Sequence, residues 1–171
     1  MTVAIAGLAA GCFQPLYASR SITGGSAVAE QLRGVELAPI PTQNASPAQR
    51  IAAELRNALI FELTGGAPAG APTHRLSLSL VPVAQQVIVD ITTSRPDVEQ
   101  TGVNATYSLT EIATGKVVLT GQTFSRVSYD NPGQEQRFAR ARGRRDAENR
   151  ATKVIAEDIR SRLASYFIAG T

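Results

Sequence analysis

Two neighbouring segments give the clearest indication of the fold: SPAQRIAAELRNALIFELTGG at residues 46–66, which has the pattern of a helix, and HRLSLSLVPV at residues 74–83, which has that of a strand. Ser46, Pro47 and Gln49 form a capping box with proline at the first helical position, and Gly65 follows as a stop signal. Between these signals the apolar residues recur every four positions, at Ile51, Leu55, Leu59 and Leu63. This spacing predicts an amphipathic helix over residues 47–64.

Alternating apolar residues on both sides of this helix predict strands. Val35 and Leu37 alternate and are followed by two prolines, which predicts a short edge strand ending near Ile40. After the helix, residues 76–91 predict one long bent strand or two short ones, and a turn is expected at residues 94–97. Two further alternating segments predict a hairpin, at residues 103–109 and 117–127.

The end of the chain has the period of a second, longer helix, which starts near residue 135. Apolar residues again recur every four positions, at Ala147, Ala151, Ile155, Ile159, Leu163 and Phe167. The order of elements predicts an α+β fold, with a mostly antiparallel four-stranded sheet and two helices packed on one face. The 171 residues fit one domain, which we expect to cover residues 33–171.

The composition argues against an enzyme or a metal protein. One Cys and one His cannot build an all-protein zinc site, so no metal, cofactor or catalytic residue is predicted. His74 is the only histidine, and no Gly-x-Ser-x-Gly motif supplies a nucleophile for it. Two carboxylate pairs lie in the arginine-rich last helix and are interpreted as surface ion pairs: Asp146 with Glu148, and Glu157 with Asp158.

The basic residues are almost all arginines and gather near the end of the chain. The net charge is +3, and only Lys116 and Lys153 among the 17 basic residues are lysines. Residues 137–162 contain nine of the basic residues and four acidic ones. Arginine binds phosphate and carboxylate in bidentate fashion. The basic residues at 137–162 therefore indicate either an anionic partner or a solvated helix face. Aromatic residues are only 5% and Trp is absent, which argues against nucleic-acid binding.

The first residues resemble a bacterial lipoprotein signal. An apolar run at residues 3–11, too short to span a bilayer, ends at Cys12 in the lipobox-like Ala9-Ala10-Gly11-Cys12. The sequence departs from that pattern because Ala9 stands where Leu is commoner and no basic residue precedes the run. We expect residues 1–11 to be a signal peptide, Cys12 to carry the lipid anchor, and residues 12–32 to form a tether. The alternative is a buried strand with an inert cysteine.

Several segments together resemble the LptE family of lipopolysaccharide-assembly lipoproteins, in its alphaproteobacterial form. They are GCFQPLY at residues 11–17, LRNAL at 55–59, LT at 109–110, TGKVV at 114–118, SY at 128–129 and DAE at 146–148. The resemblance implies a small α/β lipoprotein that plugs the lumen of the outer-membrane barrel LptD and helps to place lipopolysaccharide in the outer leaflet. Phe13 after the cysteine, instead of Asp, implies sorting to the outer membrane in such lipoproteins.

Three arginines are predicted to contact the phosphates of lipopolysaccharide or another anion. Arg95 lies at a strand turn, and Arg137 and Arg140 precede the apolar part of the last helix. The alternative for each is a solvated arginine without a ligand. A second function remains open from the sequence, because an auxiliary lipoprotein of an ABC-type lipid transporter would share the anchor, the size and a mixed α/β sheet.

Overall fold

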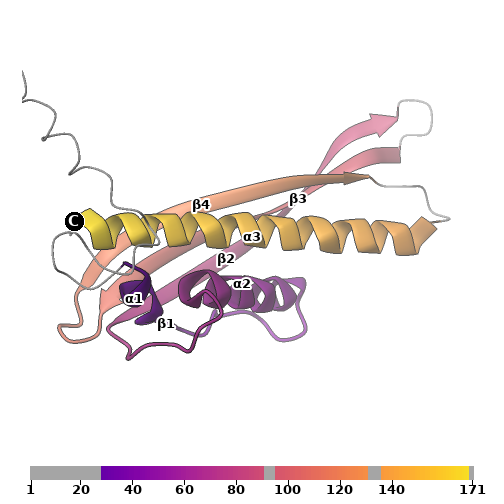
Figure 1. Ribbon diagram of the computed structural model, residues 1–171. Helices are drawn as coiled ribbons and strands as arrows, with labels where there is room; N and C mark the ends of the chain where they lie inside the picture. The colour runs from indigo at the N-terminus through magenta and orange to yellow at the C-terminus, as the bar shows by residue number, and fades with distance from the viewer. Residues whose placement is uncertain (1–27, 91–94, 131–135, 170–171) are drawn as a thin grey trace, which may run out of the picture.

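The computed structural model describes residues 28–90, 95–130 and 136–169 (Figure 1). The predicted signal peptide, Cys12 and most of the predicted tether lie outside the described residues. The elements in chain order are α1 (Val28–Arg33), β1 (Val35–Leu37), α2 (Pro47–Thr64), β2 (His74–Asp90), β3 (Arg95–Glu111), β4 (Val117–Asp130) and α3 (Arg137–Ala169).

The four strands form one sheet in the order β1-β2-β3-β4, which confirms the predicted α+β fold. β2 and β3 pair antiparallel from His74 opposite Glu111 to Asp90 opposite Arg95, and β4 continues this meander. β1 pairs parallel to the start of β2, with Val35 opposite His74, because α2 carries the chain back before β2 begins. The sheet is therefore mostly antiparallel, with one short parallel pair at its edge.

The helices cover one face of the sheet and share one core with it (Figure 1). α3 runs along β3 and β4, and α2 packs against α3 and β2. The fully buried side chains at the centre come from both layers, at Leu55, Leu59, Leu76, Leu109, Ile155 and Ile159. The apolar positions at four-residue spacing in both helices are the ones that face this core.

The predicted ends of α2 are confirmed by its caps. The Ser46 hydroxyl accepts a hydrogen bond from the backbone N–H of Gln49 at 3.3 Å, and the Gln49 side chain accepts from the N–H of Ala45 at 2.8 Å. At the other end Gly65 adopts the left-handed conformation with φ of 63°. This conformation favours glycine because it lacks a Cβ atom, so the helix ends where the sequence predicts.

Two sequence predictions were wrong in their boundaries. Residues 28–32 were expected in an irregular tether, but they form most of α1, whose Val28 and Leu32 are buried in the core. α1 is therefore a third helix of the domain. Arg95 was expected in a turn, but it is the first residue of β3 and pairs with Asp90. Residues 91–94, which connect β2 to β3, lie outside the described residues.

The opposite face of the sheet is exposed along the described strands. Its outward positions are exposed and mostly polar, at Ser77, Ser79, Val81, Asn104, Thr106, Thr120, Gln122 and Phe124. The guanidinium of Arg126 lies 5.0 Å from the centre of the Phe124 ring, as in a cation–π pair. Hydroxyl and amide groups therefore dominate this face, and a partner that offers hydrogen bonds can satisfy them.

Candidate functional site at the arginine-rich end of the last helix

The predicted arginine contacts lie where α3 extends beyond the core. α3 has 33 residues and its first buried residue is Ala147, so residues 137–142 and 144–146 are exposed and Gly143 is half-buried. The start of α3 and the hairpin end of β2 and β3 lie at the same end of the molecule (Figure 1). This end carries positive charge because the helix segment contains five arginines and one aspartate.

The three predicted contact residues have different environments at this end. Arg137 is the first residue of α3 and is exposed. Arg140 forms an ion pair with Glu99 of β3. Arg95 starts β3, four residues before Glu99, but its side chain lies outside the described part of the chain. The structure therefore brings Arg137 and Arg140 onto one helix end, close to the strand that carries Arg95.

Glu99 of β3 connects the start of α3 to the sheet through polar contacts. Glu99 is 8% exposed, and its carboxylate accepts a hydrogen bond from the Tyr129 hydroxyl of β4 and pairs with Arg140. Burial and then this hydrogen bond to Glu99 raise the pKa of Tyr129 to about 12, so the phenol stays protonated and donates. Gly143 faces the Tyr129 ring, where an added Cβ would lie 3.6 Å from it. The exposed part of α3 is thus held in place by polar contacts.

A second buried carboxylate, Glu148, joins α2 to α3. Glu148 is 4% exposed and pairs with Arg50 of α2 and with Arg144 one turn earlier in α3, the latter at 2.9 Å. Arg50 also donates to the side-chain oxygen of Asn149 at 3.2 Å. Burial is the first cause of a lowered pKa of Arg50, with Arg145 and Arg144 adding to the shift. The interpretation of Glu148 as a surface ion pair was therefore wrong.

Asp146 and the histidine have structural partners. Asp146 pairs with Arg150 at 2.8 Å on the exposed side of α3, as predicted for a surface ion pair. His74 packs edge-on against Phe167, with ring centres 5.2 Å apart, and its Nδ1 lies 2.9 Å from the Thr73 hydroxyl. His74 thus packs against the end of α3.

The described residues contain neither a cluster of metal ligands nor a membrane-spanning helix. No group of three or more His, Cys, Asp and Glu side chains among them is placed to hold a metal ion. Within the same residues, no helix combines the length and the apolar character that crossing a bilayer requires.

Sequence reasoning missed the roles of Glu99 and Glu148. The alternation of β3 contained the signal for Glu99, because it lies an even number of residues before the buried Val103 and Tyr107. Glu148 follows the first core residue of α3, and its burial depends on the neighbouring α2. Periodicity along α3 alone therefore could not distinguish it from a solvated residue.

These features define a small α+β domain with one helical layer on one sheet face, a polar open sheet face and an arginine-rich end. A family model described as LptE, lipopolysaccharide-assembly, matches residues 32–163, well over half of the chain. The chain belongs to the LptE lipopolysaccharide-assembly family, which confirms the resemblance seen in the sequence.

Solved structures share this fold at low sequence identity. A candidate lipoprotein from Caulobacter crescentus CB15 aligns with a TM-score of 0.64 and 20% identity, over 85% of this chain and 98% of that one. The rare lipoprotein B from Shewanella oneidensis aligns with a TM-score of 0.54 and 13% identity, over 79% of this chain and 96% of that one. A minor lipoprotein from Acinetobacter baumannii aligns with a TM-score of 0.54 and 12% identity, over 77% of this chain and 90% of that one. A comparison with curated proteins found no match.

Proposed function

We propose that the chain is an outer-membrane lipoprotein, anchored through Cys12, that plugs the lumen of an LptD-like barrel. In this role it assists the assembly of the barrel and the placement of lipopolysaccharide in the outer leaflet. Membership of the LptE family over residues 32–163 is the observation that carries the proposal. The role is one of binding and positioning and uses no catalytic residue or cofactor.

The open face of the sheet supports a position inside a barrel. The lumen of a large outer-membrane barrel is polar, so a plug needs a surface that exchanges hydrogen bonds with it. Ser77, Thr106 and Gln122 belong to neighbouring strands and lie on the exposed face of the sheet. Such a face contacts lumenal side chains without burying unsatisfied polar groups.

The length of the domain is also suited to a barrel that crosses a membrane. The 33 residues of α3 extend over about 50 Å at 1.5 Å per residue. A bilayer with its headgroup regions is about 40–45 Å thick. The described domain is therefore long enough to extend through the lumen of a membrane barrel.

Arg95, Arg137 and Arg140 are proposed to bind the phosphates of lipopolysaccharide. Arg137 is exposed, and Arg140 is half-exposed although one of its nitrogens pairs with Glu99. Arg95→Glu together with Arg137→Glu is expected to weaken lipopolysaccharide binding about tenfold or more, because charge-assisted hydrogen bonds are lost. A direct titration measures this, with Arg162→Glu in the far half of α3 as the control. Unchanged binding would remove both residues from the proposed site.

The proposed partner is tested by mild-detergent extraction of the tagged full-length chain from outer membranes. We expect one large β-barrel to be recovered at one-to-one stoichiometry and to remain bound during washing in high salt. The identity and ratio of the proteins are determined by mass spectrometry. Recovery of transporter components instead of a barrel would contradict the plug and favour an auxiliary lipoprotein of an ABC-type lipid transporter.

A further inference from the structure

The first ten residues of α3 carry more positive charge than the fold uses. Residues 137–146 contain five arginines and one aspartate, and the first turn holds no acidic residue. The positive end of the helix dipole lies at this terminus, so cations there are unfavourable for the helix itself. Arginines at this position therefore need an explanation outside helix stability.

The arginines divide into two sets by the side of the helix on which they lie. Arg140 and Arg144, four residues apart, pair with Glu99 and Glu148 and hold the helix to the sheet and to α2. Phe138, Arg142 and Arg145 follow the i, i+4, i+7 spacing of another side of the helix. We call these three residues the Phe138 stripe.

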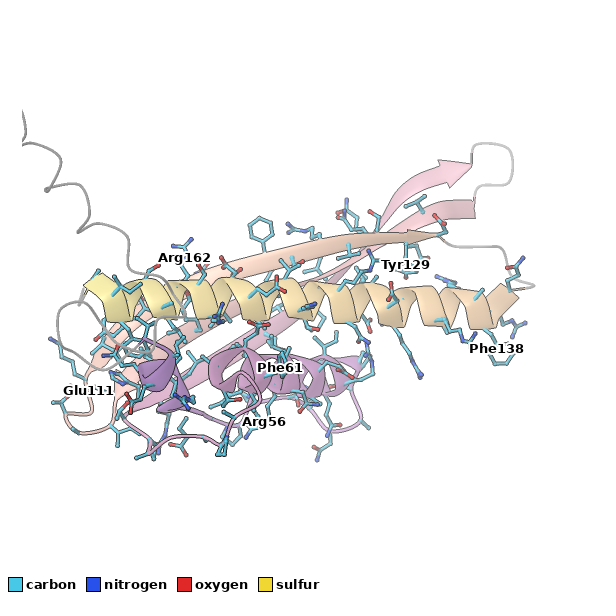
Figure 2. All side chains as sticks on the ribbon, viewed as in Figure 1. Arg56, Phe61, Glu111, Tyr129, Phe138 and Arg162 are labelled. Carbon is cyan, nitrogen blue, oxygen red and sulfur yellow. The ribbon has the colours of Figure 1, made fainter. Side chains whose placement is uncertain are left out.

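The Phe138 stripe lies on the exposed surface of the molecule. Phe138 is 89% exposed, and Arg142 and Arg145 are exposed as well. Figure 2 shows Phe138 at the start of α3, pointing away from the side of the helix that Tyr129 contacts. Within the described residues, no acidic side chain forms an ion pair with Arg142 or Arg145.

We propose that the Phe138 stripe binds the surface of a bilayer that contains anionic phospholipids. Arginine forms bidentate hydrogen bonds with phosphate headgroups, and an aromatic ring on the same side of the helix as such arginines enters the interface with them. The stripe lies on a projecting, convex helix end, whereas a site for a small soluble ligand is concave. A broad anionic surface with an apolar layer beneath it complements this combination of charge and shape.

This contact is separate from the proposed plug role, because it requires neither a barrel nor Arg95, Arg137 and Arg140. It gives the end of α3 its own affinity for a membrane surface. The chain contains no tryptophan, so Phe138→Trp introduces a single fluorescent probe at the stripe. A tryptophan that enters the lipid interface emits at shorter wavelength and is quenched by brominated acyl chains.

The experiment uses the full-length chain with Cys12→Ser, so that no acyl chain holds the protein on the vesicles. The fluorescence emission of the Phe138→Trp variant is expected to shift to shorter wavelength when phosphatidylcholine vesicles that contain phosphatidylglycerol are added. Vesicles of phosphatidylcholine alone are expected to cause no shift. Arg142→Gln and Arg145→Gln are each expected to lower the partition onto the anionic vesicles about fivefold. Arg162→Gln, on the distant half of α3, serves as the charge control.

A matched control places the probe at another exposed phenylalanine. Phe61 of α2 is 64% exposed and lies outside the stripe, so Phe61→Trp should show no shift. Equal shifts at both positions, equal binding to neutral vesicles, or no shift at Phe138 would each overturn the proposal. A shift with lipopolysaccharide micelles but not with phospholipid vesicles would also overturn it, while leaving the proposed lipopolysaccharide role intact. If the extraction experiment recovers no β-barrel, the proposed plug role fails, but the binding of the Phe138 stripe to vesicles is expected to remain.

Discussion

Cys12→Ser is expected to abolish lipid attachment and to release the chain from the membrane fraction in a high-salt wash, which also weakens the proposed contact of the Phe138 stripe. A serine hydroxyl cannot form the thioether bond, and Cys12 is the only cysteine in the sequence. Each buried methylene contributes about 0.8 kcal/mol, and two acyl chains already give stable anchoring, so the loss of all chains changes membrane attachment by orders of magnitude. Incorporation of labelled palmitate and fractionation of cells that lack a barrel partner measure the effect.

A second substitution distinguishes the lipobox from a mere requirement for a thiol. Ser26→Cys in the Cys12→Ser background restores one cysteine at a position outside the lipobox-like segment. We expect this double variant to remain unlabelled and to be found in the soluble fraction after a high-salt wash. Palmitate incorporation that persists in Cys12→Ser would show that the anchor is elsewhere and would contradict the signal-peptide boundary at residue 11.

Ile159→Ala is expected to lower the free energy of unfolding by about 2–5 kcal/mol. Ile159 is fully buried in α3, and it belongs to the cluster that joins the three helices to the sheet. Truncation removes apolar contacts and leaves a cavity between layers that cannot fully collapse, because both layers are held by other core residues. Urea unfolding followed by circular dichroism measures the change.

The matched control for this prediction lies on the same helix. Val154 is 50% exposed, so Val154→Ala is expected to change the free energy of unfolding by less than about 0.5 kcal/mol. Equal losses in the two variants would mean that helix propensity, and not burial, determines the effect. An unchanged urea midpoint for Ile159→Ala would contradict the buried position of this side chain in the core.

Local sequence signals were sufficient for the two long helices and for the meander. In α2 the capping box and Gly65 define both ends, and in α3 the apolar residues repeat every four positions over several turns. The strands alternate because one face of the sheet is buried and the other is exposed. These patterns arise within one element, so they can be recognised without knowing its neighbours.

α1 was missed because its stability depends on contacts with distant residues. A helix of six residues is too short to be stable alone, and its buried Val28 and Leu32 pack against elements much later in the chain. The parallel pairing of β1 with β2 has the same origin, since α2 and a loop separate the two strands. No local pattern reports which edge a three-residue strand joins.

The candidate site divides in the same way. The sequence shows three of its features directly. These are the many arginines near the start of α3, the single cysteine after an apolar run, and the order of segments that resembles the LptE family. The sequence does not show which of these arginines form ion pairs that stabilise the fold. Arg140 and Arg144 pair with Glu99 and Glu148 only because β3 and α2 pack against α3, whereas Arg142 and Arg145 lie on another side of the helix.

The long helices, the order of the strands and the family follow from the sequence alone, because these depend on periodicity, caps and motifs within short segments. Which charged side chains are buried and which face outward depends instead on how the elements pack against one another. A carboxylate such as Glu99 can be buried only where an arginine and a hydroxyl from other elements compensate its lost hydration, and the packing of those elements sets that arrangement.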